Sequence, residues 1–258
     1  MKETQKLQDQ FRTKGYVLLK KYLNNESLAI LEECANELES LPDKPGKIMK
    51  YYEASGFDGS QILNRVEQFS DTFSSVDALL TNGAISEAVK LVAGITPSLF
   101  KEKINFKMPG GGGFNAHQDA PAFTRFIKDE LVVVMIPIDK TDEKNGCLKV
   151  ARNFFERKIT PHVEGTVEAS LLSEISWESI HMNPADILVF SSWLLHKSDM
   201  NHSAGPRGNY FITYNDLKHG NKRDEYFDFK RRYFPPLIER KPDVNYQEWT
   251  SKLSKKIL

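Results

Sequence analysis

The chain has 258 residues, of which 40% are hydrophobic and 11% aromatic, so it has material for a sizeable core. This length exceeds an average domain, but single β-barrel and β-sandwich domains reach it. The 35 Lys and Arg residues balance 35 Asp and Glu residues, which leaves a formal net charge of zero. No global field therefore points to nucleic acid or an anionic membrane surface, and a small-molecule partner is favoured.

The sequence contains two cysteines, Cys34 and Cys147, and their number does not suggest a disulfide framework. We expect two buried thiols in a reducing compartment. The N-terminus is charged and lacks the apolar stretch of a signal peptide. The longest apolar run, residues 131–137, suits a buried strand and is too short to span a bilayer. The sequence therefore predicts a cytoplasmic protein without a membrane segment.

The first part of the chain is predicted to be mostly helical. Leu28, Leu31, Ala35 and Leu38 recur at helical spacing, and the polar residues just before them offer N-cap chemistry. We expect helices at residues 5–14, 28–41 and 84–92 and one strand at residues 15–19. The sequence therefore predicts a helical N-terminal flank over about residues 1–98.

After Pro97 the pattern changes to short apolar segments separated by turn residues. We expect strands at residues 99–108, 131–138, 147–150, 176–182, 187–190 and 210–214. Many short strands behind a helical flank predict a mainly β fold, a double-stranded β-helix or jelly-roll barrel with helices packed outside. We expect one domain over residues 1–258, with the barrel at about 99–216 and a C-terminal extension at 217–258. Its basic stretch, residues 252–256, is predicted to be a solvated tail.

Three residues carry the strongest indication of chemistry: His117, Asp119 and His196. Two imidazoles and one carboxylate are the ligands of non-heme Fe(II) centres, where they cover one face of an octahedron and leave the other positions for a co-substrate and O2. Asp119 follows His117 by two residues, so both side chains point to the same side if the segment is extended. His196 follows the apolar strand expected at residues 187–190. The trio predicts an iron site.

Arg207 strengthens this interpretation. It lies 207 − 196 = 11 residues after the second histidine and opens a strand-like segment. Its planar fork can hold the far carboxylate of a keto acid whose other end chelates the metal. The sequence therefore predicts an oxygenase that uses a keto-acid co-substrate.

Four consecutive glycines, residues 110–113, precede the His117 segment. They match neither a Walker loop, which closes on Gly-Lys-Ser/Thr, nor a dinucleotide fingerprint, which opens a helix. We expect a pliant strand connection that delivers His117 and Asp119 to the barrel mouth. The remaining histidines are interpreted as structural residues: His162, His181, His202 and His219.

Several segments in combination resemble the phytanoyl-CoA dioxygenase family. They are residues 103–107, 117–123, 145–148, 196–207 and 234–240, and the resemblance extends from about residue 15 to residue 240. Members of that family are Fe(II)- and 2-oxoglutarate-dependent oxygenases on a double-stranded β-helix, and they release succinate and CO2. The resemblance implies that the His-Asp-His trio binds iron and that Arg207 binds 2-oxoglutarate. It also implies that Asn105, Lys107 and Trp193 lie near the co-substrate.

One departure from the family concerns the substrate. Many relatives follow Asn-Gly-Cys-Leu with a Pro-Gly-Ser-His turn, whereas this chain continues differently over residues 149–154. The change argues against a long acyl-CoA and favours a small polar metabolite, such as an aminophosphonate or an amino acid. Arg125, Lys149 and Arg152 are candidates to bind its acidic group, and each could equally be an ordinary surface residue. Asn201 is a further candidate.

Two other functional classes stay open at this point. A zinc hydrolase could use two histidines and a carboxylate, but the chain has no His-Glu-x-x-His helix and no obvious base. A jelly-roll barrel that binds a small ligand without turnover is the second alternative. The sequence does not indicate an oligomeric state.

Overall fold

The computed structural model describes residues 2–163 and 166–246. The predicted solvated tail, residues 252–256, lies outside the described residues. Both cysteines are free and buried, as predicted. No helix in the described ranges is long and apolar enough to cross a membrane.

Seven antiparallel strands form a large sheet in the order β1-β11-β6-β13-β4-β3-β2. Their bounds are β1 Tyr16–Leu19, β2 Met49–Ala54, β3 Gln61–Glu67, β4 Pro97–Lys107, β6 Val132–Pro137, β11 Ile187–Ser191 and β13 Arg207–Asp216. The strand β13 pairs with β4 on one side and with β6 on the other. The last strand of the described residues therefore lies in the middle of the sheet.

A smaller sheet of four strands, in the order β10-β7-β12-β5, lies opposite the large one. Its strands are β5 Phe114–His117, β7 Leu148–Ala151, β10 Trp177–Ile180 and β12 His196–Ser198, and a separate two-stranded ribbon joins β8 His162–Val163 to β9 Thr166–Val167. Apolar side chains of the two sheets meet in a shared core, for example Val133 and Phe190 with Leu148 and Ile180. This arrangement is the predicted double-stranded β-helix, or jelly roll.

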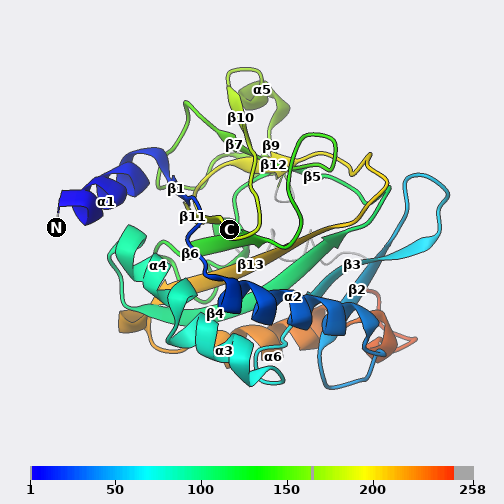
Figure 1. The fold of residues 1–258 in the computed structure, drawn as a ribbon. Helices are drawn as coiled ribbons and strands as arrows, with labels where there is room; N and C mark the ends of the chain where they lie inside the picture. The colour runs from blue at the N-terminus through cyan, green and yellow to red at the C-terminus, as the bar shows by residue number, and fades with distance from the viewer. Residues whose placement is uncertain (1, 164–165, 247–258) are drawn as a thin grey trace.

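Helices cover the other face of the large sheet, where α2, α3 and α4 lie beneath it in Figure 1. The helices are α1 Lys2–Lys14, α2 Asn25–Ser40, α3 Ser74–Thr81, α4 Ala84–Ala93, α5 Ala169–Leu172 and α6 Arg223–Tyr233, with short 3-10 turns at Ala120–Ala122, Leu217–His219 and Leu237–Glu239. The apolar faces of α2 and α4 pack on the sheet in a second core, to which α2 contributes Leu31 and Leu38 and α4 contributes Val89 and Val92.

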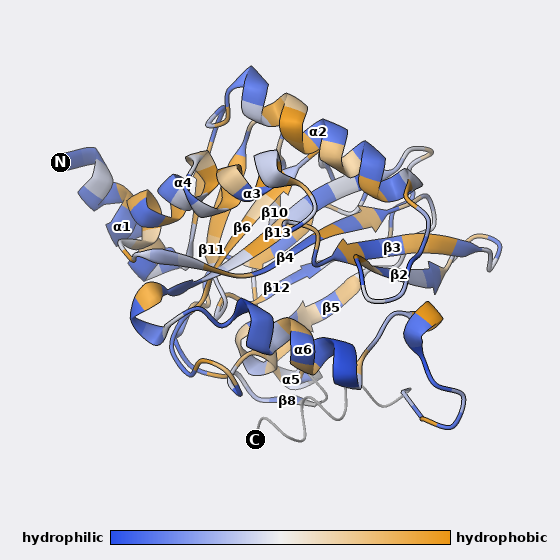
Figure 2. Cartoon of the chain, turned by 90° about the horizontal axis from the view of Figure 1, so that it is seen from below, coloured by the Kyte–Doolittle hydropathy of each residue, from blue (hydrophilic) through white to orange (hydrophobic). Residues whose placement is uncertain are grey.

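The large sheet is buried on both faces, and this explains its continuous apolar strands. Along β6, Val132 and Val134 face the helices, whereas Val133 and Met135 face the small sheet. Figure 2 shows β6 and β11 mostly in the colour of hydrophobic residues, and α1 and α6 mostly in that of hydrophilic ones. The central strands were therefore recognisable from composition alone.

The prediction of a mostly helical flank was wrong for part of that segment. The strand predicted at residues 15–19 is present as β1, but the hairpin of β2 and β3 was not predicted, and all three strands belong to the large sheet. The two hairpin strands carry charged residues such as Lys50 and Glu67 that are buried in the structure. These charged residues interrupt the alternation of apolar and polar residues from which a strand is usually predicted.

The C-terminal extension contains a helix, α6, that we did not predict. Its sequence is strongly polar, yet Arg223 and Lys230 are buried. Arg223 forms ion pairs with Glu102 of β4 and with Asp71, and Lys230 pairs with Glu67 of β3. These pairs satisfy the two buried charges, while Tyr226 and Phe227 of the same helix pack in an apolar cluster with Phe100.

The N-terminus of α2 provides a test of local stability. The Asn24 side chain accepts a hydrogen bond of 2.8 Å from the backbone N–H of Ser27. Replacing an N-cap Asn by Ala leaves this N–H unpaired, so we expect Asn24→Ala to lower the free energy of unfolding by about 1 kcal/mol. Urea titration of both proteins measures the difference. The neighbouring Asn25→Ala is the control, because Asn25 is exposed and makes no cap; an equal loss in both variants would contradict the assignment.

Candidate functional site

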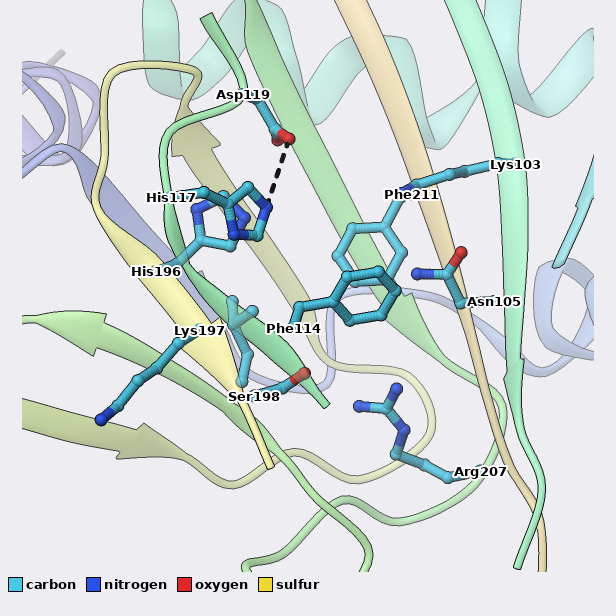
Figure 3. Close-up of a pocket in the computed structure, with 11 residues that line it drawn as sticks. Lys103, Asn105, Phe114, His117, Asp119, His196, Lys197, Ser198, Arg207 and Phe211 are labelled. Atoms are coloured by element: carbon cyan, nitrogen blue, oxygen red, sulfur yellow. Dashed lines mark ion pairs between the residues drawn. The ribbon is translucent and has the colours of Figure 1, made fainter. Parts of the chain in front are cut away.

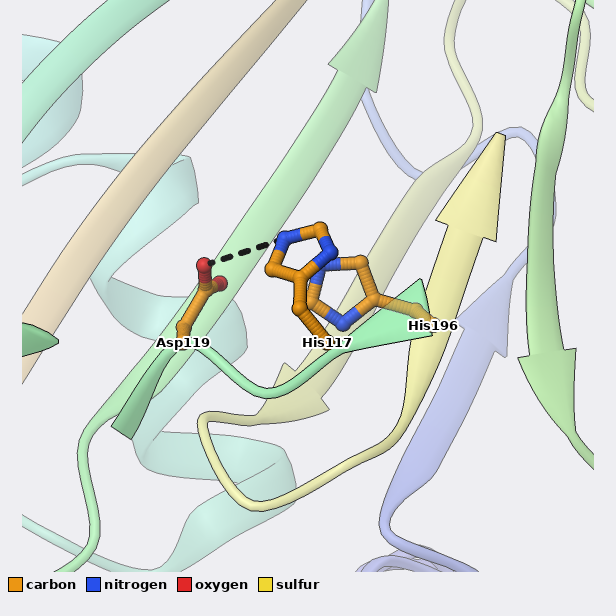
Figure 4. Close-up of side chains that lie close together, drawn as sticks. All are labelled: His117, Asp119 and His196. Carbon is orange, nitrogen blue, oxygen red and sulfur yellow. Dashed lines mark ion pairs between the residues drawn. The ribbon is translucent and has the colours of Figure 1, made fainter. Parts of the chain in front are cut away.

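The small sheet brings together His117, Asp119 and His196 (Figure 4). His117 ends β5 and His196 begins β12, and the two residues are direct partners in the antiparallel register. Their ring centroids are 4.2 Å apart. Asp119 lies in the turn after β5, with its Oδ1 3.9 Å from Nε2 of His117. One ligand atom of each residue lies within 4.8 Å of the others, so the predicted trio is one cluster.

Backbone contacts fix how the two imidazoles are presented. Nδ1 of His117 donates to the carbonyl of Asn115 at 2.6 Å, and Nδ1 of His196 donates to that of Leu194 at 2.9 Å. Because a carbonyl can only accept, each ring is left with Nε2 as its free lone pair. Metal-binding histidines usually use the second nitrogen in this way.

The protonation states also suit a cation. Desolvation and the adjacent His196 lower the pKa of His117 to about 4, so its ring is neutral at physiological pH. Burial opposes ionisation of Asp119, but the two neighbouring imidazoles outweigh it and lower the pKa of this carboxyl. Two imidazole nitrogens and one carboxylate converge on one point, and this donor set fits a divalent iron.

The trio lies at one side of a cavity of about 60 Å³ between the two sheets (Figure 3). Such a volume holds roughly four to six water molecules. The lining residues are Lys103, Asn105, Phe114, His117, Asp119, Leu148, His196, Lys197, Ser198, Arg207 and Phe211. The cavity therefore suits small molecules.

Arg207 lies at the other end of this cavity, as Figure 3 shows. Its side chain is buried, and Nη1 donates to the carbonyl of Gly146 at 3.0 Å. Within the described part of the chain its Nε has no hydrogen-bond partner. Burial lowers the pKa of Arg207 to about 10, so the group stays charged at neutral pH. A buried guanidinium with a free donor fits an incoming carboxylate.

Two neighbours of Arg207 come from β4, which pairs with β13. Lys107 is the direct cross-strand partner of Arg207, and its Nζ donates to Oγ of Ser198 at 2.9 Å. Burial and the proximity of Arg207 lower the pKa of Lys107 to about 7. Asn105 lines the cavity, and its buried Oδ1 accepts no hydrogen bond from the residues described. The structure thus brings Arg207, Lys107 and Asn105 close together, and Arg207 and Asn105 line the cavity.

The three cations predicted to bind substrate lie elsewhere. Arg125 is exposed and its guanidinium stacks on Phe229, 4.5 Å from the ring centroid. Lys149 forms an ion pair with Asp199. Arg152 is exposed and borders a separate hollow beside β1. None of the three lines the cavity that holds the trio, so the geometry gives no support to this role.

Trp193 and Asn201 also lie outside the cavity wall. The carbonyl of Trp193 accepts a hydrogen bond of 2.7 Å from the Gln118 amide, beside the metal cluster. The Asn201 amide donates to the carbonyl of Lys107 at 2.8 Å and to that of Gly205 at 2.9 Å. Both residues therefore hold neighbouring segments in position and do not line the cavity.

Several cavity residues were not predicted: Lys103, Phe114, Leu148, Lys197, Ser198 and Phe211. Strand alternation could have identified two of them. Lys103 precedes Asn105 by two residues on β4, and Ser198 follows His196 by two on β12, so each shares a face with a predicted residue. Phe211 required knowledge of the register, which places it opposite Lys103.

The glycine segment before β5 is held by hydrogen bonds. Gly110 has a φ of +76° and donates to the carbonyl of Asn201 at 2.9 Å. A Cβ at Gly113 would lie 2.5 Å from the carbonyl oxygen of Ser198, which only glycine avoids. The connection that we predicted to be pliant is thus closely packed in the structure, and it holds the start of β5 against the end of β12.

Comparison with known proteins decides the family. The model of the family described as Phytanoyl-CoA dioxygenase (PhyH) matches residues 11–209. The chain belongs to this family. A 2-aminoethylphosphonate dioxygenase from the uncultured bacterium HF130_AEPn_1 is 40% identical over 94% of this chain and 93% of its own length. A methylphosphonate hydroxylase from Gimesia maris is 34% identical over 88% of this chain and 86% of its own.

A solved structure, EctD from S. alaskensis with 2-oxoglutarate and 5-hydroxyectoine, aligns with a TM-score of 0.70. It is 16% identical, and the alignment covers 83% of this chain and 76% of that one. The predicted membership of the phytanoyl-CoA dioxygenase family and the predicted jelly-roll fold are both confirmed. As a member of this family the chain is an enzyme, an oxidoreductase of the dioxygenase class.

Proposed function

We propose that this phytanoyl-CoA dioxygenase family member is an Fe(II)- and 2-oxoglutarate-dependent hydroxylase of a small organophosphonate. One observation supports the proposal above all: the His117, Asp119 and His196 cluster and the unsatisfied guanidinium of Arg207 face the same small cavity. A metal trio alone fits several enzyme classes. An arginine fork at the far end of its cavity adds a site for a dicarboxylate.

In this proposal Nε2 of His117, Nε2 of His196 and a carboxylate oxygen of Asp119 would hold the iron. The two backbone contacts of the Nδ1 atoms keep the rings oriented for this role. When bound, the iron with 2-oxoglutarate and O2 supplies the oxidative chemistry, which converts R–H to R–OH and releases succinate and CO2. The protein binds the reactants, orients the C–H bond and excludes water.

Arg207 receives the distal carboxylate of 2-oxoglutarate. Its free Nε and the nearby Nζ of Lys107 both lack a carboxylate partner among the residues described. A carboxylate between them offsets the repulsion that lowers the pKa of Lys107. Asn105 lines the wall between Arg207 and Lys103, and its open Oδ1 accepts from a bound water or from substrate.

The substrate class is inferred from the relatives and from the charge of the site. Both relatives described above carry names of organophosphonate-oxidising enzymes and align over nearly the whole chain. Two cationic side chains of the cavity wall, Arg207 and Lys103, suit the acidic groups of the co-substrate and of a phosphonate such as 2-aminoethylphosphonate.

The test combines spectroscopy with turnover. Anaerobic addition of Fe(II) and 2-oxoglutarate is expected to produce a weak visible charge-transfer band. With O2, succinate release is expected to increase strongly on addition of 2-aminoethylphosphonate or methylphosphonate, and mass spectrometry of the product is expected to show one added oxygen atom. Phytanoyl-CoA serves as the matched control. Absence of the band, or faster succinate release with phytanoyl-CoA than with any phosphonate, would overturn the proposal.

A further inference from the structure

A lysine lies in the cavity at the end opposite Arg207. Lys103 of β4 extends into the space between Asp119 and Phe211, as Figure 3 shows. Its position follows from strand alternation: Ile104 and Phe106 pack in the core under the helices, so Lys103, Asn105 and Lys107 face the small sheet. The iron trio belongs to the small sheet and lies across the cavity from Lys103 and Arg207.

The ammonium of Lys103 lacks a direct partner in the described part of the chain. Over residues 2–163 and 166–246, no hydrogen bond or ion pair of its Nζ is found, and its contact is with the Phe211 ring, 5.0 Å from the centroid. The carboxylate opposite it on β3, Glu67, is paired with Lys230 and with Arg65 at 3.1 Å. Asp119 and Glu67 attract Lys103 only at longer range, so its three N–H donors are free for a ligand.

The surroundings of Lys103 add further positive charge. Lys101 is buried two residues away on the same strand and donates to the Tyr226 hydroxyl at 3.4 Å. Burial, with Lys101 alongside, lowers the pKa of Lys103 to about 7, so an anion that binds here favours the charged form of the lysine. The charge distribution therefore favours an anionic ligand at this end.

The two cationic groups of the cavity differ in the donors that they offer. The planar fork of Arg207 can hold a carboxylate through two parallel N–H groups. Lys103 offers a compact point charge with three rotatable donors. With the carboxylate of the co-substrate at Arg207, Lys103 is a second cation in the cavity wall, available to the acidic group of the substrate.

We propose that Lys103 binds the phosphonate group of the substrate and so determines the specificity of the enzyme. This inference rests on the proposed hydroxylase function and adds the residue that selects the substrate class. The phosphonate lies beside Phe211, and the rest of the substrate extends toward the iron trio. The positive charge of Lys101, two residues away on the same strand, adds to the attraction of the phosphonate.

Direct binding of methylphosphonate tests the assignment without turnover. The probe is titrated calorimetrically, under argon, into protein loaded with Fe(II) and 2-oxoglutarate. Lys103→Met keeps the length of the side chain and removes the charge, so we expect its affinity for methylphosphonate to fall about ten- to a hundredfold. Lys103→Arg keeps the charge and is expected to retain most of the binding. Lys90→Met is the matched control, because Lys90 is an exposed residue of α4. This variant is expected to bind methylphosphonate as the parent does.

Two further measurements separate this role from a structural one. Thermal unfolding is expected to be nearly unchanged in Lys103→Met, and its charge-transfer band with 2-oxoglutarate is expected to be intact. Equal affinity of parent and Lys103→Met for methylphosphonate would overturn the assignment and leave the proposed function standing. A parent that binds no methylphosphonate, yet releases succinate with another substrate, would overturn both. Loss of the 2-oxoglutarate band in Lys103→Met would reject a specific role toward the substrate.

Discussion

Replacement of His117 or His196 by Ala is expected to abolish iron binding and reduce succinate formation to background. Each imidazole supplies one of three protein ligands, and Nε2 is its free donor atom because Nδ1 is occupied by a backbone carbonyl. Asp119→Ala is expected to remove hydroxylation while retaining weak iron binding through the two remaining nitrogens. Metal analysis of the purified variants, together with a succinate assay, measures both effects.

His181→Ala is the matched control for these variants. His181 is an exposed histidine whose Nε2 pairs with Glu143 at 2.7 Å, so its loss leaves the metal cluster intact. We expect parental iron content and activity. Near-parental turnover in any one of the three ligand variants would show that the trio does not hold the catalytic metal.

The second large effect is expected at Arg207. A charge-assisted contact of this kind contributes about 1.5–3 kcal/mol, so Arg207→Ala is expected to raise the KM for 2-oxoglutarate roughly ten- to a hundredfold. Arg207→Lys is expected to restore little of this loss, because an ammonium lacks the fork. Steady-state kinetics at saturating substrate give the comparison, and the apparent KM for the phosphonate is expected to change far less.

Arg125→Ala controls for the general loss of a positive charge. Arg125 is exposed, and its guanidinium stacks on the ring of Phe229, outside the cavity. We expect unchanged KM values for 2-oxoglutarate and for the phosphonate. If Arg207→Ala kept the parental KM for 2-oxoglutarate, the proposed binding mode of the co-substrate would be rejected.

The metal cluster could be predicted from the sequence because its information is local. His117 and Asp119 are two residues apart, and His196 follows a continuous apolar strand. The central strands of the large sheet were predictable for the same reason, since burial on both faces leaves uninterrupted apolar runs such as β6. Single-domain organisation stays a prediction.

The residues that complete the cavity could not be found in this way. Lys103 and Phe211 are separated by more than a hundred positions and meet only because β4 and β13 pair in one particular register. Conversely, Lys149 looked available in the sequence, but in the structure it is neutralised by Asp199. The hairpin of β2 and β3 and the helix α6 were missed because buried ion pairs such as Glu67 with Lys230 replace the apolar periodicity on which such predictions depend.

The position of β13 has a consequence for how the chain reaches its native state. This strand contains residues 207–216 but lies between β4 and β6, which are complete some seventy residues or more earlier in synthesis (207 − 137 = 70). Until it inserts, the edges of β4 and β6 stay unpaired, and open edges of apolar strands are prone to association. The pairing is also long-range, which slows folding. We therefore expect the nascent chain to depend on chaperones late in translation, and truncation before residue 207 to yield aggregates instead of a smaller folded core.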